Sequence, residues 1–292
     1  MVKLSRGERV FEILNTIFLI LISVVFLLPL FTVLSTSLIG EAEYARRGLF
    51  FLWPEKPVLT AYELLLSGGS VVLNAYTITL FRVIVGTFLN LVFTITLAYV
   101  LARRNLPGRT FLTIFVFVPM VFSGGLIPSF ILMDTIGLLN SVWAMIIPGL
   151  VSAWNMLIMR NFFMALPPEL EEAAIVDGAG PLTILTRIVL PLSLPAIATI
   201  GLFYAVAHWN AWFDAAIYIK DLRKLPVQVI LRGILQQAIM LEPETMANVQ
   251  TMPPSAALQA AMVVISTVPI LLVYPFLQKY FVKGALIGSI KG

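Results

Sequence analysis

A short polar segment between two apolar runs has the residue types and the spacing of a helix that contacts another protein. Pro168 is followed by three carboxylates within residues 169–172, and both proline and acidic side chains favour the first turn of a helix. Gly178 and Pro181 come next; glycine suits the left-handed end of a helix, and proline prevents its continuation. The pattern predicts a helix of about two to three turns, which is too short to span a bilayer and therefore lies along a membrane face.

A second group of residues whose types could bind a substrate lies inside a long apolar run. Tyr204, His208 and Trp212 recur every four residues, so a continuous helix would place them on one face. Aromatic rings with polar tips suit sugars, because the rings stack on apolar sugar faces and the tips meet hydroxyl groups. The sequence predicts a substrate path formed by five residues, which are Tyr204, His208, Trp209, Asn210 and Trp212.

These residues also have a structural interpretation, which the sequence leaves open. Tyr and Trp are enriched where a membrane meets water, and this aromatic belt is favoured for Trp212 and Asp214. The alternative for Asn210 is a hydrogen bond between helices. The same helix-packing role is predicted for three further amides in the apolar runs, namely Asn90, Asn140 and Asn155.

Two further polar features interrupt the apolar runs. Arg82 lies about two turns into one of them, and the favoured interpretation is that its side chain reaches out to the outside surface; contact with an anionic substrate is the alternative. Residues 123–128 read Ser-Gly-Gly-Leu-Ile-Pro and predict a break in another run. Such a break either lines a cavity or is a simple kink.

The composition excludes several classes of protein. Hydrophobic residues make up 60% of the 292-residue chain and charged residues 12%, with a mean hydropathy of +0.98, whereas a soluble domain carries about 25% charged residues. The sequence has no Cys and a single His, which excludes a disulfide framework and most metal sites. It also lacks the glycine-rich loop that binds ATP phosphates. We therefore expect no catalytic residue, no metal site and no ATP hydrolysis by this chain.

The spacing of charges predicts membrane spans. Five stretches without Asp, Glu, Lys or Arg are long enough for the roughly 20 residues that a spanning helix needs, and a sixth is interrupted only by Arg82. The predicted fold is an all-α membrane protein with six transmembrane helices and one permease domain over residues 1–292. The predicted spans are residues 14–37, 76–102, 110–133, 139–160, 188–213 and 257–280.

The basic residues predict the orientation. With the N-terminus inside, eleven of the 19 Lys and Arg residues fall inside and seven outside, with Arg82 in a span. Positive charge marks the cytoplasmic side of membrane proteins, so both termini are predicted to be cytoplasmic. Residues 38–75 and 214–256 then form outside loops, and residues 161–187, which carry the short acidic helix, form an inside loop.

The inside loop resembles the EAA loop of ABC-importer permeases. Glu172-Ala173-Ala174, Gly178 and Ile188-x-Leu190-Pro191 fill every fixed position of that pattern at the correct spacing. The basic start, the outside loop after the first span and the Gly288–Gly292 tail are also similar to maltose-type permeases, especially the subgroup for complex oligosaccharides and polysaccharide fragments. The resemblance covers most of the chain and implies the type I importer permease fold, in a bacterial inner membrane.

The resemblance also implies partners and roles. The expected partners are a second homologous permease, two cytoplasmic ATPases that bind ATP and Mg, and an external solute-binding protein that delivers a carbohydrate; acidic oligosaccharides such as alginate or pectin fragments fit the subgroup. The short helix would then be a coupling helix that docks on an ATPase. The residues implied in this contact are Glu172, Ala173, Ala174, Asp177, Gly178 and Pro191, and Pro191 and Pro195 would end or kink the start of span five.

Three other interpretations compete with this one. An ion-coupled secondary carrier needs an ionisable group at the middle of the membrane, for which Arg82 alone is a poor candidate. A membrane enzyme needs a catalytic group of residues that the sequence lacks. An ordinary interfacial helix would need no ATPase at all.

Overall fold

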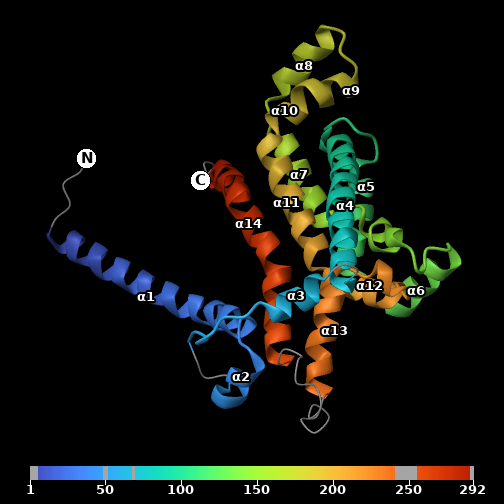
Figure 1. The fold of residues 1–292 in the computed structure, drawn as a ribbon. Coiled ribbons are helices and arrows are strands. Elements are labelled where there is room, and N and C mark those ends of the chain that lie inside the picture. Colours follow the sequence, from blue (N-terminus) through green and yellow to red (C-terminus); the bar gives the residue numbers. More distant parts are fainter. Residues whose placement is uncertain (1–5, 49–51, 68–69, 241–254, 290–292) are drawn as a thin grey trace. The chain divides into compact units, whose positions relative to one another are not determined.

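The structure of this chain is a computed structural model that describes residues 6–48, 52–67, 70–240 and 255–289 (Figure 1). Three helices of the described chain are continuous and apolar enough to cross a bilayer. They are α1 (Arg6–Ser37), α4 (Val71–Ala102) and α14 (Ser255–Ser289). The start of the predicted basic N-terminus, residues 241–254 of the second outside loop and the last three residues of the tail lie outside the described residues.

Three further spans consist of helices joined at a bend. The helices α5 (Arg109–Val121) and α6 (Leu126–Thr135) meet at 113°. The 3-10 helices η1 (Val142–Met145) and η2 (Ile147–Gly149) meet α7 (Ala153–Met164) at 48°. Residues Pro181–Leu192 meet α11 (Leu194–Asn210) at 83°. If each bent pair is one span, the described chain has the six predicted spans, and the all-α membrane fold is confirmed.

The predicted loops contain short helices of their own. The outside loops hold α2 (Glu41–Arg47), α3 (Thr60–Leu66), α12 (Phe213–Tyr218), η4 (Leu222–Lys224) and α13 (Val227–Met240). The inside loop holds α8 (Pro168–Val176) and α9 (Pro181–Ile184), followed by the π-helix η3 (Leu185–Val189) and α10 (Leu190–Leu192). The break at residues 122–125 was expected, whereas the break between η2 and α7 was not.

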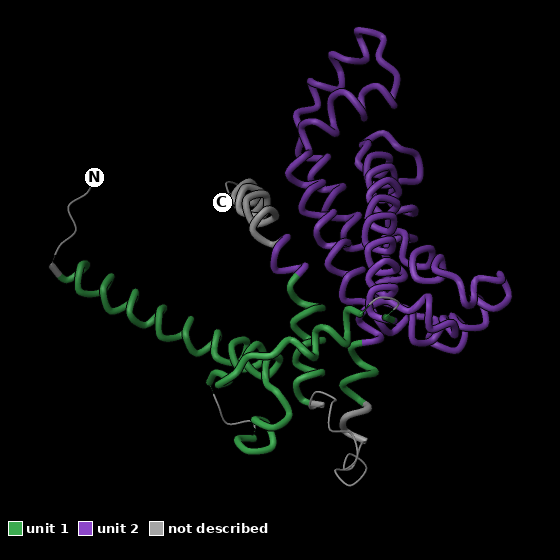
Figure 2. The backbone as a smooth tube through the Cα atoms, in the orientation of Figure 1, with its two compact units in different colours: residues 1–70, 231–268 green, residues 71–230, 269–292 purple. Residues whose placement is uncertain are grey.

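The chain divides into two compact units, residues 1–70 with 231–268 and residues 71–230 with 269–292 (Figure 2). In the first unit, the end of α1 is joined to the following loop by the hydroxyl pair of Ser37 and Tyr62 at 2.6 Å and by the bond from Val58 N to Leu38 O at 2.9 Å. The most apolar stretch of α1 is not buried by the rest of the chain. An apolar helix so exposed needs lipid or another protein around it. The single permease domain stays a prediction.

The second unit is built around α4, which packs against α11 and α7. One face of α4 is buried at every third or fourth position, which is the helical period. The buried positions include small and polar residues, which let helices approach closely and bond to each other inside a membrane. This face of α4 comprises Ala75, Thr79, Arg82, Gly86, Asn90, Thr94 and Ala98.

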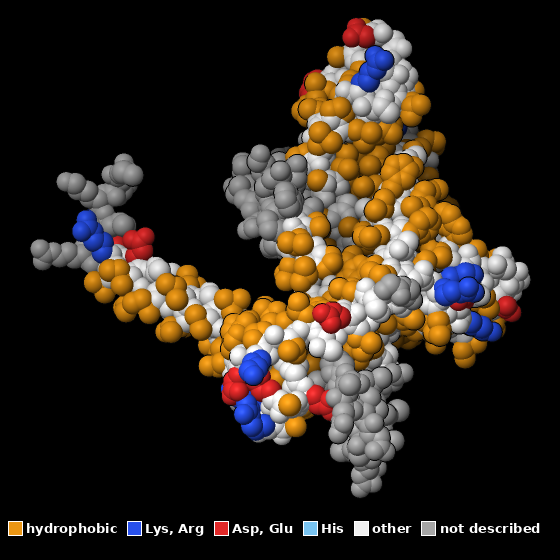
Figure 3. Space-filling view, viewed as in Figure 1, with side chains coloured by type: hydrophobic (Ala, Val, Ile, Leu, Met, Phe, Trp, Pro, Cys, Tyr) orange, Lys and Arg blue, Asp and Glu red, His pale blue; other side chains and the backbone are white. Residues whose placement is uncertain are grey.

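The two ends of this unit differ in the loops that meet there. At one end, the termini of α4 and α7 lie beside α8, and Arg109 Nε and Arg160 Nε both donate to Leu101 O, at 3.0 and 3.1 Å. At the other end, Asn140 Oδ1 accepts bonds from the backbone of Lys220 and Asp221. Figure 3 shows hydrophobic side chains along this unit between charged groups at the α8 tip and near α6 and α12. The grouping agrees with the predicted assignment of loops to opposite membrane sides.

A close approach of α4 and α11 depends on Gly86. A Cβ atom at Gly86 would lie 2.6 Å from Nε2 of His208 on α11, which is far inside van der Waals contact. The absence of a side chain at Gly86 therefore lets the imidazole of His208 lie against the backbone of α4.

We expect Gly86→Ala to lower the stability of the α4–α11 pair by about 1–3 kcal/mol, because overpacking forces a buried side chain out of its rotamer. Thermal unfolding of the solubilised chain measures the effect. Gly124→Ala is the matched control, since a Cβ there meets nothing within 4 Å. Equal melting temperatures for both variants would contradict the close approach.

Candidate functional site

The inside loop forms the short helix that the sequence predicts. Helix α8 begins with Pro168 in its first turn, where Glu169 and Glu171 supply the negative charge that favours a helix start. It ends at Gly178, whose φ is +79°. Ala179 N donates to Ala174 O at 2.9 Å and Gly178 N donates to Ile175 O at 3.0 Å, which is the Schellman arrangement. The short helix and its glycine stop are both confirmed.

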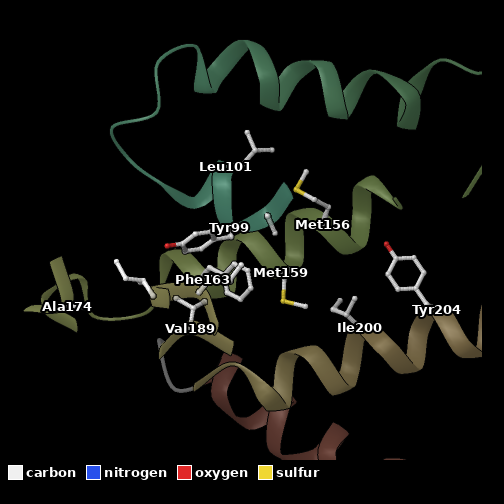
Figure 4. Close-up of a cluster of buried hydrophobic side chains, with 12 residues drawn as sticks. Tyr99, Leu101, Met156, Met159, Phe163, Ala174, Val189, Ile200 and Tyr204 are labelled. Atoms are coloured by element: carbon white, nitrogen blue, oxygen red, sulfur yellow. The ribbon is translucent and has the colours of Figure 1, made fainter. Parts of the chain in front are cut away.

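The residues implied in partner contact face different ways. Glu172, Ala173, Asp177 and Gly178 are exposed, whereas Ala174 is 8% exposed and belongs to the hydrophobic cluster of the second unit. Figure 4 shows this cluster, with Ala174 at the α8 edge and Phe163, Val189, Met159 and Tyr99 behind it. Ala174 therefore anchors α8 to its own chain and leaves the opposite side of the helix exposed.

Three large apolar residues of α8 are exposed in this chain, and Leu170 is the least exposed of them at 42%. Val176 is 87% exposed and Ile175 is 57% exposed. Large aliphatic side chains so exposed on a short helix mark a surface for a partner. Ile175 was not predicted from the sequence to be part of this surface. Its position one helical turn after the carboxylates of α8 could have indicated that it lies on the same side. Glu172 thus lies in a surface that is acidic at one edge and aliphatic at the other.

A chain of polar contacts ties α8 to the end of α4. Glu171 pairs with Arg103 at 3.0 Å, Arg103 donates to the Tyr99 hydroxyl at 2.7 Å, and that hydroxyl donates to Pro181 O at 3.2 Å. The Arg103 guanidinium also lies 5.0 Å from the centre of the Tyr99 ring. The hydrogen bond to Tyr99 raises the pKa of Arg103 against a smaller effect of burial. The first half of α8 and the start of α9 are therefore both bonded to the end of α4.

A cleft of about 490 Å³ lies beside α8. Its apolar floor comes from the ends of α4 and α7 and from η3, and charged side chains from α8 and the α4–α5 turn stand at its rim. Residues from each part are Tyr99, Arg103, Arg104, Phe163, Glu172 and Ile188. The cleft and the exposed side of α8 together offer a mixed apolar and charged surface to a protein partner.

The chain runs from α8 into span five through a series of bends. The π-helix η3 places Leu185 and Val189 in the hydrophobic cluster, and α10 contains Pro191. The sharp bend falls at Ser193, between α10 and α11, and Pro195 lies in the first turn of α11. The predicted kink at the start of span five is confirmed. A displacement of α8 would therefore reach α11 through a segment that is bent but helical.

The predicted substrate stripe is divided by the structure. Helix α11 ends at Asn210, so Trp212 lies beyond it and the expected shared face with Tyr204 and His208 is wrong. The helix ends there because the backbone of Ala211 is extended, and a period-of-four argument holds only within one helix. Trp212 is half-buried, with its ring 5.5 Å from that of Phe213 in an edge-on arrangement.

Tyr204 and His208 lie between α11 and α4. The Tyr204 hydroxyl shares a hydrogen bond with Thr94 Oγ1 at 2.7 Å and accepts one from Ser152 N at 3.0 Å. His208 Nε2 lies 2.6 Å from Oδ1 of Asn90. Both side chains are buried. Their contacts within this chain join helices, and their part in a substrate path stays a prediction.

The two other stripe residues have different surroundings. Trp209 is buried, and its ring centre lies 6.3 Å from that of Tyr76. Asn210 is exposed and its amide donates to Val206 O at 3.0 Å. Of the stripe residues, only Asn210 presents a polar side chain at the end of α11 that is open to an adjacent molecule.

The expected outward reach of Arg82 is wrong. Its side chain is 3% exposed and forms an ion pair with Asp214. A charged side chain within a span is costly unless it is paired inside the protein, and Asp214 lies close enough to satisfy it. The four-residue spacing of Arg82, Gly86 and Asn90 marks one face of α4, but it does not indicate Asp214 as the partner.

The three predicted helix-packing amides differ in role. Asn90 is confirmed, since its amide nitrogen donates to Gly149 O and Leu150 O at 2.7 and 2.9 Å. Asn140 instead holds a turn, with φ of 57°. Asn155 is buried in α7, where its backbone N–H donates to the capping Ser152 side chain.

Within the described part of the chain, no cluster of three metal-ligating side chains is found.

A helical membrane protein with an exposed short helix, tied to its bundle at the end where basic residues gather, is a permease component of a transporter. Residues 95–286 match the family described as the inner membrane component of binding-protein-dependent transport systems, and this chain belongs to that family. Family membership sets aside the ion-coupled carrier as a description of this chain.

Several proteins are similar to this chain over nearly its whole length. Protein LplC of Bacillus subtilis (strain 168) is 43% identical over 290 residues, which are 99% of this chain and 97% of the relative. The polygalacturonan/rhamnogalacturonan transport system permease protein YtcP of the same organism is 40% identical, over 98% of this chain and 99% of the relative.

A solved structure resembles the fold as well. A chain of a bacterial ABC transporter involved in the import of the acidic polysaccharide alginate superposes with a TM-score of 0.86 at 31% identity. The similarity covers 96% of this chain and 100% of that chain. The interrupted spans and the short helix therefore belong to a known permease fold.

We expect Gly178→Val to destabilise the end of α8 by about 1–2 kcal/mol, because a β-branched residue is strained in the left-handed conformation. Gly178→Asn should cost less, since asparagine tolerates that conformation. Hydrogen exchange of the α8 amides measures the effect. Gly180→Val is the control, because Gly180 has φ of −75° and open space around it; equal exchange in both Val variants would refute this explanation.

Proposed function

We propose that this chain is the permease subunit of an ATP-driven importer of oligosaccharides. The observation that carries the proposal is the exposed side of α8, where Glu172 stands beside Ile175 and Val176 on a helix fixed to its own bundle by Ala174 and Glu171. Such a surface suits an arginine-containing apolar cleft of a cytoplasmic ATPase. A second homologous permease and an external solute-binding protein complete the proposed assembly.

In this proposal the energy comes from the partners. Two ATPase subunits bind ATP and Mg, approach each other, and displace the α8 helices that are docked on them. Because Glu171, Arg103 and Tyr99 join α8 to α4, and η3 and α10 join it to α11, the displacement tilts the α4–α7–α11 bundle. The path between the two permeases then opens alternately to the outside and to the cytoplasm. Both termini lie in the cytoplasm in this arrangement.

The substrate class rests on the relatives. One relative is a permease for polygalacturonan and rhamnogalacturonan, another at 27% identity is an arabinooligosaccharide permease, and the similar solved structure belongs to an alginate importer. These names support a complex oligosaccharide, with uronate-containing fragments as the first candidates. Asn210, exposed at the end of α11, is the stripe residue placed to meet it, with Trp212 beside it.

Glu172→Lys should lower substrate-stimulated ATP hydrolysis of the reconstituted importer about tenfold, because it reverses the charge presented to the ATPase and a loss of roughly 1.4 kcal/mol in coupling has that size. Glu169→Lys is the matched control, since the same exposed residue type changes on the same helix outside the motif. Amount of assembled complex and ATPase rate are measured together. Equal rates for Glu172→Lys and wild type would contradict α8 as the coupling helix.

The substrate class has its own measurement. With the cognate binding protein supplied, uronate oligomers should stimulate ATP hydrolysis in proteoliposomes more than neutral oligosaccharides of the same length, and monosaccharides should not stimulate it. Asn210→Ala should reduce uptake of the stimulating sugar by about tenfold, because a buried hydrogen bond to sugar is lost. Stimulation by neutral sugars alone would overturn the uronate preference, and stimulation by no carbohydrate would overturn the substrate class.

A further inference from the structure

The guanidinium of Arg82 uses its full hydrogen-bonding capacity. An arginine side chain carries five N–H bonds, and Arg82 has five acceptors around it. Nε donates to His208 Nδ1 at 3.4 Å, Nη1 donates to Ala211 O at 3.4 Å and to Asp214 Oδ1 at 3.2 Å, and Nη2 donates to Met145 O at 3.2 Å and to Asp214 Oδ2. The side chain is thus enclosed on all sides by its own chain.

The acceptors of Arg82 lie where helices of two different spans end or begin. Ala211 directly follows the end of α11, and Asp214 is in the first turn of α12. Met145 is the last residue of η1, just before η2. Carbonyl groups at such breaks have lost regular helical partners and need others inside a membrane. One side chain on α4 therefore bonds both interrupted spans.

A second set of contacts continues from the first. Because His208 Nδ1 accepts from Arg82, the proton of the neutral ring is assigned to Nε2, which donates to Asn90 Oδ1 at 2.6 Å. The amide nitrogen of Asn90 then donates to Gly149 O and Leu150 O, where η2 gives way to α7. The donors and acceptors are complementary along the whole series, and each step crosses from one helix to another.

An ion pair in apolar surroundings stabilises a fold little more than well-packed apolar side chains do, and its best-attested use is to specify one arrangement. Here the arrangement specified is the relative position of η1, η2 and the α11–α12 junction against α4. That junction carries Asn210 and Trp212. The end of the bundle that holds α8 lies at the opposite terminus of α4, beyond the hydrophobic cluster of Ala98, Tyr99 and Leu101.

We propose that Arg82, through Asp214, is a positioning residue of the transport cycle. It holds the outer ends of the two interrupted spans to α4, so that a displacement applied at α8 moves the Asn210–Trp212 segment together with α4 as one body. Without this connection the breaks would bend, and motion from α8 would be lost before it reached the outer end. The inference rests on the proposed function, since it assigns the connection a place in the same cycle.

The test uses the complete importer in nanodiscs and proteoliposomes, with Arg82→Lys as the first variant. Lysine keeps the charge but has three donors on one atom and cannot bond acceptors in two spans at once. We expect assembly and ATP hydrolysis within about twofold of wild type, and sugar transported per ATP about tenfold lower, within the range of measured coupling effects. Asp214→Asn should shift the same ratio in the same direction by a smaller factor, and it decides the outcome if Arg82→Lys fails to assemble.

Ile219→Ala is the matched control. Ile219 is 6% exposed and lies in the small cluster of Met145, Ala215 and Leu225 at the same end of the unit, but it makes none of the bonds of Arg82. It should lower the melting temperature and leave sugar per ATP unchanged. If Arg82→Lys only reduces assembly, with a normal ratio, then Arg82 has a structural role alone and the proposal is overturned.

Hydrogen exchange of the full chain in nanodiscs supplies an independent readout. Arg82→Lys should speed exchange in residues 142–150 and 211–218 and leave residues 168–176 at wild-type rates. Unchanged exchange at both breaks would overturn the connection itself. A wild-type importer that moves no sugar on ATP hydrolysis would instead refute the proposed function, and the exchange result would still decide whether Arg82 holds the breaks.

Discussion

The structure of the second unit depends on the contact of α4 with α11, where a buried face of small and polar residues replaces a purely apolar one. Inside a membrane no water satisfies a polar group, so each donor and acceptor on this face needs a partner from another helix. Gly86 brings the helices close enough for His208 to reach Asn90, and Arg82 reaches the ends of two spans. This face bonds carbonyl groups at the break of span four and at the end of α11, where regular helical partners are lost.

The same bundle connects two functional ends. At one end, Ala174 fills the hydrophobic cluster and Glu171 pairs with Arg103, so α8 moves with α4 while its other side stays exposed for a partner. At the far end, the α11–α12 junction carries Asn210 and Trp212. The proposed function requires such a connection, because in it the energy is delivered at α8 and used where substrate passes. The connection has two chemically different parts. The hydrophobic cluster forms it near α8, and the polar face of α4 forms it toward the other end of the bundle.

Some of this could be predicted because it is local in sequence. Runs without charges longer than a bilayer is thick indicated the spans, and proline, carboxylates and glycine in order indicated α8 and its end. The kink at Pro191 and Pro195 followed from the same local chemistry. The stripe of Tyr204, His208 and Trp212 failed at its last member because nothing in the apolar sequence marks the end of α11 at Asn210. The break between η2 and α7 was missed although Pro148, Gly149 and the capping Ser152 mark it locally, because a run without charges predicts one continuous span.

The sequence by itself determined that the chain has apolar spans of membrane-crossing length and that the loop at residues 161–187 carries a short helix ended by a glycine. These properties depend on hydrophobicity, charge and capping over a few neighbouring residues. Only the tertiary structure decided that Arg82 is paired with Asp214, 132 residues away, that Ala174 faces its own chain, and that His208 joins helices. Whether a polar side chain in a membrane reaches water, substrate or another helix depends on which atoms the folded chain places within hydrogen-bonding distance, and spacing along one helix contains no information about the helix opposite.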